Sequence, residues 1–188
     1  MASYQLRFAM VVPLPVKEVF EVFENPYNLL KITPPWLDFR VTNPDKVVMR
    51  KGASISYKFK MMGIPLSWTT LIASYDPPVQ FIDEQSSGPY TRWHHLHTFE
   101  ETAEGIAVRD VVDYTLPFGA LGKLAQPIVK HQLMQIFSFR QQALAEMWGG
   151  AKITHPVILA VDYFLFDDLR SSPQELPIRQ LIRSQVCS

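Results

Sequence analysis

Much of the chain consists of segments in which apolar and polar residues alternate. The clearest is residues 52–61, where Ile55, Tyr57 and Phe59 alternate with serine and lysine. A period of two sends successive side chains to opposite faces of a strand, so this segment predicts a strand with one wet face. The same pattern predicts further strands at residues 4–12, 37–43, 66–75, 79–85, 90–100 and 106–117.

Helical spacing occurs in two short segments after the first strand and in one long segment after the last strand. Residues 15–25 carry an apolar stripe behind a proline that suits a first turn, and residues 26–36 predict a second short helix that ends at Pro34–Pro35. Residues 118–150 predict a long amphipathic helix that ends at two glycines, with a kink or restart at Pro127.

This order of elements predicts an α+β fold. Six consecutive strands with short connections favour an antiparallel meander, and the isolated first strand adds a seventh. Because one face of the sheet is wet, the other must be covered, and only the long helix is large enough. We therefore expect a curved seven-stranded antiparallel sheet wrapped around that helix, with two short helices between the first two strands. Such an arrangement leaves a concave space lined by aromatic residues, which suits a ligand cavity.

The C-terminal part of the chain differs in composition from the rest. We expect residues 1–150 to form one ligand-binding domain and residues 151–188 to form an extension whose structure the pattern does not define. The apolar run at Val157–Phe166 is too hydrophobic to lie in water, so we expect it to dock on a surface.

Composition and charge exclude several classes of protein. Hydrophobic residues make up 47% and charged residues 19% of the chain, which indicates a globular protein. Eighteen basic residues balance eighteen acidic ones, so no nucleic-acid partner is expected. A single cysteine, Cys187, gives no internal disulfide and no cysteine cluster for zinc. We find no signal peptide and no apolar run that could span a membrane, so we expect a cytoplasmic protein.

Three of the five histidines fall within the segment GPYTRWHHLHTFE, residues 88–100. Strand alternation places Trp93, His95, His97 and Phe99 on one face, and the opposite face is mostly polar. The first set is therefore expected to point inward, whereas the remaining histidine, at position 94, faces solvent.

The following strand supplies partners for these residues. If residues 102–105 (TAEG) form the hairpin loop, Asp110 lies opposite His97 and Tyr114 lies opposite Trp93. A buried carboxylate needs a partner, and His97 provides one.

The long helix adds a third inward polar group. Arg140 falls near the centre of the apolar stripe that also contains Leu133 and Phe137. A guanidinium there must find a carboxylate or an anionic ligand, unless it reaches past the end of the sheet to solvent. Asp110 is the first candidate partner, and the Asp83–Glu84 pair comes next.

Three interpretations of the inward polar residues remain open. His95, His97 and Asp110 could form a satisfied polar cluster that fixes the core. His97 and Asp110 could act as an acid–base pair and are the candidate catalytic residues. The two histidines with a carboxylate could also form a facial metal triad, but no second carboxylate is fixed nearby, so we predict neither a metal nor another cofactor. The chain has no Gly-x-Ser-x-Gly elbow and no phosphate-binding glycine loop.

The runs FIDEQSSGPYTRWHHLHTFE, VRDVVDYTLPFGALGKL and IFSFRQQAL resemble uncharacterised bacterial members of the SRPBCC superfamily. These are helix-grip proteins similar to START domains, the major birch-pollen allergen and the polyketide cyclase/dehydrase group. The resemblance covers about residues 4–148. It implies a seven-stranded sheet that grips a C-terminal helix around a cavity for lipids, sterols, polyketides or hormones. Only some members are enzymes, and no catalytic motif of this subgroup can be transferred.

Together these features favour a protein that binds a small hydrophobic or amphipathic ligand, lipid-like or polyketide-like, in an internal cavity. One alternative is a cyclase or dehydratase in which Asp110 tunes His97. Another is an interaction module that docks on a partner through the C-terminal tail. The oligomeric state is not predicted. The expected ligand-binding residues are Tyr57, Trp68, Trp93, His95, His97, Phe99, Asp110, Tyr114, Leu133, Phe137 and Arg140.

Overall fold

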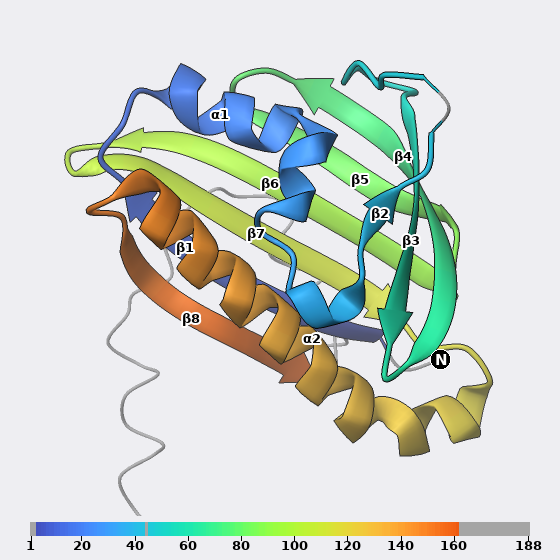
Figure 1. The fold of residues 1–188 in the computed structure, drawn as a ribbon. Coiled ribbons are helices and arrows are strands. Elements are labelled where there is room, and N and C mark those ends of the chain that lie inside the picture. The colour runs from blue at the N-terminus through green and yellow to red at the C-terminus, as the bar shows by residue number, and fades with distance from the viewer. Residues whose placement is uncertain (1–2, 44, 162–188) are drawn as a thin grey trace, which may run out of the picture.

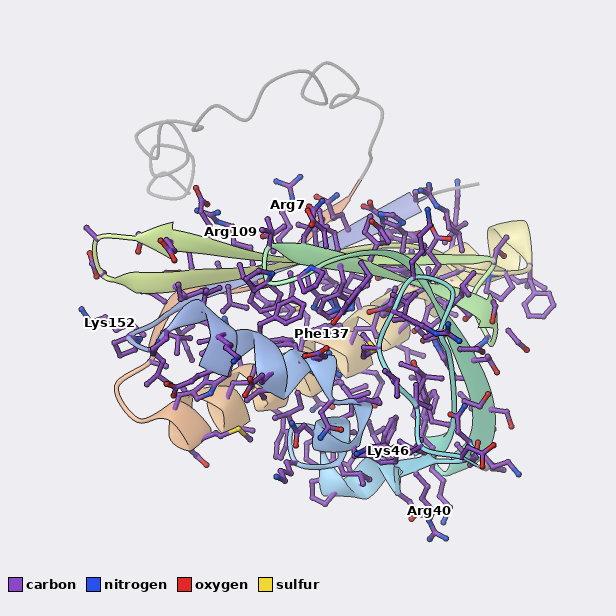
Figure 2. The ribbon with its side chains drawn as sticks, turned by 90° about the horizontal axis from the view of Figure 1, so that it is seen from above. Arg7, Arg40, Lys46, Arg109, Phe137 and Lys152 are labelled. Carbon is purple, nitrogen blue, oxygen red and sulfur yellow. The ribbon has the colours of Figure 1, made fainter. Side chains whose placement is uncertain are left out.

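The computed structural model, which describes residues 3–43 and 45–161, confirms the α+β helix-grip fold. One curved antiparallel sheet has its helices on the concave face only (Figures 1 and 2). Its strands follow the order β2-β3-β4-β5-β6-β7-β1-β8. Their bounds are β1 Ser3–Val12, β2 Arg40–Val41, β3 Ser54–Met61, β4 Ile64–Asp76, β5 Gln80–Ser87, β6 Arg92–Thr102, β7 Gly105–Thr115 and β8 Lys152–Val161.

The helices differ from the predicted ones in two details. The first short helix is α1 (Val16–Glu24), but the second is two 3₁₀ turns, η1 (Pro26–Leu30) and η2 (Pro35–Leu37). The long helix α2 (Gly119–Trp148) is one α-helix that contains Pro127, so the predicted restart is wrong. Because Pro127 is exposed, water can satisfy the carbonyl that loses its backbone partner there. No helix in the described part of the chain is long and apolar enough to cross a membrane.

The sheet has one strand more than the seven predicted. β8 pairs antiparallel with β1, so the sheet continues beyond residue 150. This pairing covers the backbone of β1 on the side away from β7, which would otherwise be an open edge. The predicted docking segment Val157–Phe166 begins within β8, and the rest of the predicted extension, including any tail that docks on a partner, lies outside the described residues.

The concave face holds two apolar clusters separated by polar residues. One contains Trp93 on β6 and Val112 on β7, and the other contains Phe99 on β6 and Val108 on β7. His95, His97 and Asp110, all buried, occupy the strand positions between them. The fold therefore places a small polar group in the middle of an otherwise apolar layer.

Candidate functional site

A cavity of about 160 Å³ lies between the sheet and α2, with residues of α1 and η1 on a further side. Phe137 of α2 points into the space between helix and sheet, whereas Arg7 and Arg109 lie on the outer face of the sheet (Figure 2). Eight of the predicted ligand-binding residues line the cavity: Tyr57, Trp68, Trp93, His95, His97, Leu133, Phe137 and Arg140.

Three of the predicted residues do not line the cavity. Phe99 packs against the Phe20 ring of α1 at a centroid distance of 5.1 Å, so the helix covers it. Tyr114 is fully buried and packs against Tyr4. Asp110 is only 1% exposed and lies behind the two histidines that contact it. All three face the concave side as expected, but neighbouring side chains fill the space in front of them.

The aromatic wall of the cavity satisfies its polar atoms internally. The Trp68 indole Nε1 donates to Thr70 Oγ1 at 2.9 Å, and the Tyr57 hydroxyl lies 2.6 Å from the same oxygen. Tyr57 stacks on Trp68 with an angle of 12° between the rings, and Trp93 meets Trp68 edge-on at 5.2 Å. Since the polar atoms of Trp68 and Tyr57 are already bonded, these rings offer a ligand mainly apolar contact.

The β6–β7 hairpin has the predicted register. Trp93 pairs with Tyr114, and His97 pairs with Asp110. His95 Nε2 donates to Asp110 Oδ1 at 2.8 Å. His97 Nδ1 lies 2.5 Å from the same carboxylate oxygen, but away from the direction of a hydrogen bond. One buried carboxylate thus contacts both inward imidazoles.

Asp83 of β5 completes this group, and the predicted site did not include it. It pairs with His95 across the β5–β6 ladder. Its Oδ2 accepts a hydrogen bond from His97 Nε2 at 2.9 Å and lies 3.6 Å from His95 Nδ1. Asp83, His95, Asp110 and His97 therefore form a closed ring, called the His–Asp ring below, in which the imidazole centroids are 3.8 Å apart. A signal existed in the sequence, because a buried Phe81 implies that Asp83, two positions later, also faces inward.

Burial and the two carboxylates act in opposite directions on the histidines. Burial would lower the pKa of His97, but attraction to the Asp110 carboxylate and the hydrogen bond to Asp83 raise it to about 9. Burial and repulsion by His97 lower the pKa of His95. Burial would raise the carboxyl pKa of Asp83 and Asp110, but contact with the histidines lowers the pKa of both below its usual value. The ring at neutral pH therefore contains two carboxylates, a protonated His97 and a neutral His95.

Arg140 lines the same cavity without a direct partner in the protein. None of the ion pairs or hydrogen bonds among the described residues includes it, and its Nε is buried without an acceptor. The predicted ion pair with Asp110 or Asp83–Glu84 is therefore not formed, because the histidines hold the aspartates and Glu84 bonds to His94. The guanidinium lies 5.1 Å from the centre of the Phe137 ring.

Asp83, His95 and His97 also place three potential metal ligands within 4.8 Å of one another. Each ring nitrogen already lies 2.5–3.6 Å from a carboxylate oxygen, however, and the Arg140 cation lines the same cavity. Protons can therefore satisfy the group without a metal. The predicted absence of a metal stays a prediction, which elemental analysis of the purified protein would test.

No protein-family model matches this chain, and no curated protein matches it either. Solved structures do resemble it. Protein TTHA0849 of Thermus thermophilus is 21% identical with a TM-score of 0.55, over 76% of this chain and 94% of that one. Protein CV1439 of Chromobacterium violaceum is 16% identical with a TM-score of 0.58, over 77% of this chain and 96% of that one. The major latex-like protein 151 of Panax ginseng is 11% identical with a TM-score of 0.56, over 79% of this chain and 99% of that one. These similarities support the helix-grip fold, and membership of the SRPBCC superfamily stays a prediction.

Proposed function

We propose that this protein binds a small apolar or amphipathic molecule in the cavity between the sheet and α2. The observation that carries the proposal is a cavity walled by aromatic rings, two of which have their polar atoms bonded within the protein. Such walls favour an apolar ligand body, while Asp83, the two histidines and Arg140 line the same space and suit a polar end. The resemblance to helix-grip proteins agrees with this role.

The size of the cavity limits the ligand. A volume of about 160 Å³ is close to that of an engineered protein cavity of roughly 150 Å³ that binds benzene. A single ring, or a short branched chain, therefore fills it. A sterol or a long acyl chain would have to extend outside, so we favour a compact ligand over a long-chain lipid.

Ligand extraction with matched variants tests the proposal. Mass spectrometry of an organic extract of the purified protein should reveal a reproducible small molecule. Leu133→Trp, which fills the cavity, should lose it, whereas Ile128→Trp, on an exposed position of the same helix, should retain it. Equal amounts in both variants would place the ligand elsewhere. An empty extract, together with no thermal stabilisation by any single-ring compound, would refute the proposal.

A second candidate is an enzyme of the cyclase or dehydratase type that uses His97 and Asp110. The observation in its favour is the buried His97 between two carboxylates, with a pKa raised to about 9. Such a histidine is a proton donor at neutral pH, not a base, and Asp110 holds it from behind. His97→Gln should then abolish turnover but leave ligand affinity within about tenfold. Turnover that survives the substitution would exclude this role.

A further inference from the structure

We infer that the cavity selects neutral ligands that present a hydrogen-bond acceptor, such as a ketone or amide carbonyl, to Arg140, and that it discriminates against carboxylates. This inference rests on the proposed ligand binding and specifies the ligand's polar end. Three observations carry it: the guanidinium without a hydrogen-bond partner, the charge balance of the groups around it, and the compact cavity that Arg140, Asp83 and the two histidines line.

The unpaired guanidinium requires an acceptor. Arg140 donates to no described residue, and its buried Nε has no partner. Buried donors in folded proteins are nearly always satisfied, and a charged donor without an acceptor is the most costly kind. Contact with the Phe137 ring offsets only part of this cost, because it supplies no acceptor atom. A ligand oxygen in the cavity would supply the missing acceptor.

The histidine geometry limits the positive charge of the site. The imidazole centroids of His95 and His97 lie 3.8 Å apart, and two cationic rings at this distance would repel each other. Repulsion therefore disfavours a second positive charge, and His95 Nδ1, 3.6 Å from Asp83, makes no hydrogen bond that would require one. With the two carboxylates of Asp83 and Asp110, the His–Asp ring then carries a net charge of about −1 or −2. The positive charge of Arg140 brings the whole site to about 0 or −1.

This charge balance decides which acceptor fits. A bound carboxylate would add a negative charge to a buried site that already lacks a positive excess, in a cavity that Asp83 also lines. A neutral carbonyl oxygen satisfies the Arg140 donors without that addition. The arginine therefore favours a neutral acceptor, although a half-buried guanidinium alone would favour an anion.

Three single-ring probes of nearly equal shape test the inference: acetophenone with a neutral acceptor, benzoate with an anionic one, and isopropylbenzene with none. Isothermal titration calorimetry measures the binding of all three probes, since it does not depend on the optical properties of the probe. In the wild-type protein acetophenone should bind at least about tenfold more tightly than either of the other two probes. Benzoate binding as tightly as acetophenone would overturn the inference.

Two variants locate the selectivity. Arg140→Met should bring acetophenone and isopropylbenzene to nearly equal affinities, with isopropylbenzene binding changed less than about threefold. Arg109→Met, the same change on the outer face of the sheet (Figure 2), should leave wild-type selectivity intact. A preference for acetophenone that persists in Arg140→Met would also overturn the inference.

The isopropylbenzene arm separates failure of this inference from failure of the proposed function. If isopropylbenzene binds and acetophenone gains nothing over it, the cavity binds ligands and only the inference fails. If none of the three probes binds the wild-type protein, the proposed function fails and the inference fails with it. The wild-type comparison needs no variant, so it decides even if Arg140→Met does not fold.

Discussion

At the scale of single residues, His97 is controlled by the two carboxylates that contact it. Asp83 accepts its Nε2–H at 2.9 Å, and Asp110 lies 2.5 Å from its Nδ1. These contacts outweigh burial and raise its pKa from 6.5 to about 9. A group whose pKa is raised by folding stabilises the folded protein fully below its unfolded pKa, and this contribution disappears as the pH rises through the folded pKa. His97 therefore links stability to pH on the alkaline side of neutrality.

We predict that the free energy of unfolding falls between pH 7 and pH 10 by up to about 3 kcal/mol more in the wild type than in His97→Gln. Glutamine does not titrate, whereas all other groups that titrate in this range are shared by the two proteins. Urea unfolding at a series of pH values measures the difference. Parallel pH profiles would show that His97 does not hold its proton as the contacts indicate.

At the scale of elements, the β6–β7 hairpin sets the position of the polar group. Thr102 pairs with Gly105, which fixes His97 opposite Asp110. Gly105 has φ of +132°, and a Cβ built on it would lie 2.4 Å from the carbonyl oxygen of Val12. The turn therefore requires glycine both for its backbone conformation and for the close approach of β1.

Gly105→Ala should lower the free energy of unfolding by at least about 2 kcal/mol, because strain and the clash with Val12 add together. Gly63→Ala is the matched control. Gly63 also has positive φ, +80°, but a Cβ there meets no atom within 4 Å, so we expect a loss of only about 1 kcal/mol. Chemical denaturation of both variants tests this. Equal losses would mean that the contact with Val12 is relieved at little cost.

How well the site could be predicted from the sequence depended on the length of the connections between neighbouring strands. The β6–β7 register could be derived because a tight turn and strict alternation leave one sensible pairing. The β5–β6 connection, residues 88–91, is longer and contains Gly-Pro, so no register placed Asp83 beside the histidines. The ion pair expected for Arg140 failed for a related reason. A helical wheel gives the face of α2 but not its height over the sheet, which tertiary packing sets.

At the scale of the whole molecule, one sheet separates two different surfaces. Its concave face carries the helices, the cavity and the His–Asp ring, while Arg7 and Arg109 lie on the outer face (Figure 2). The general fold could be predicted from the sequence, because the alternation of apolar and polar residues shows that one face of the sheet is wet and the other is covered. β8 did not, because its apolar run contains Pro156 and lies beyond the long helix, where the local pattern does not specify a pairing partner. Its role is to pair with β1, whose Leu6 and Met10 lie in the core.

Removal of β8 should therefore affect the whole molecule and not only its end. A chain that ends at Gly150 leaves the backbone N–H and C=O groups along one side of β1 without partners, and such an edge favours pairing with other chains. We expect a lower midpoint of thermal unfolding and self-association that light scattering after size-exclusion chromatography detects. The matched control is a chain that ends at Val161, which keeps all eight strands. If the two truncated chains unfold at the same temperature and are equally monomeric, pairing with β8 does not stabilise β1.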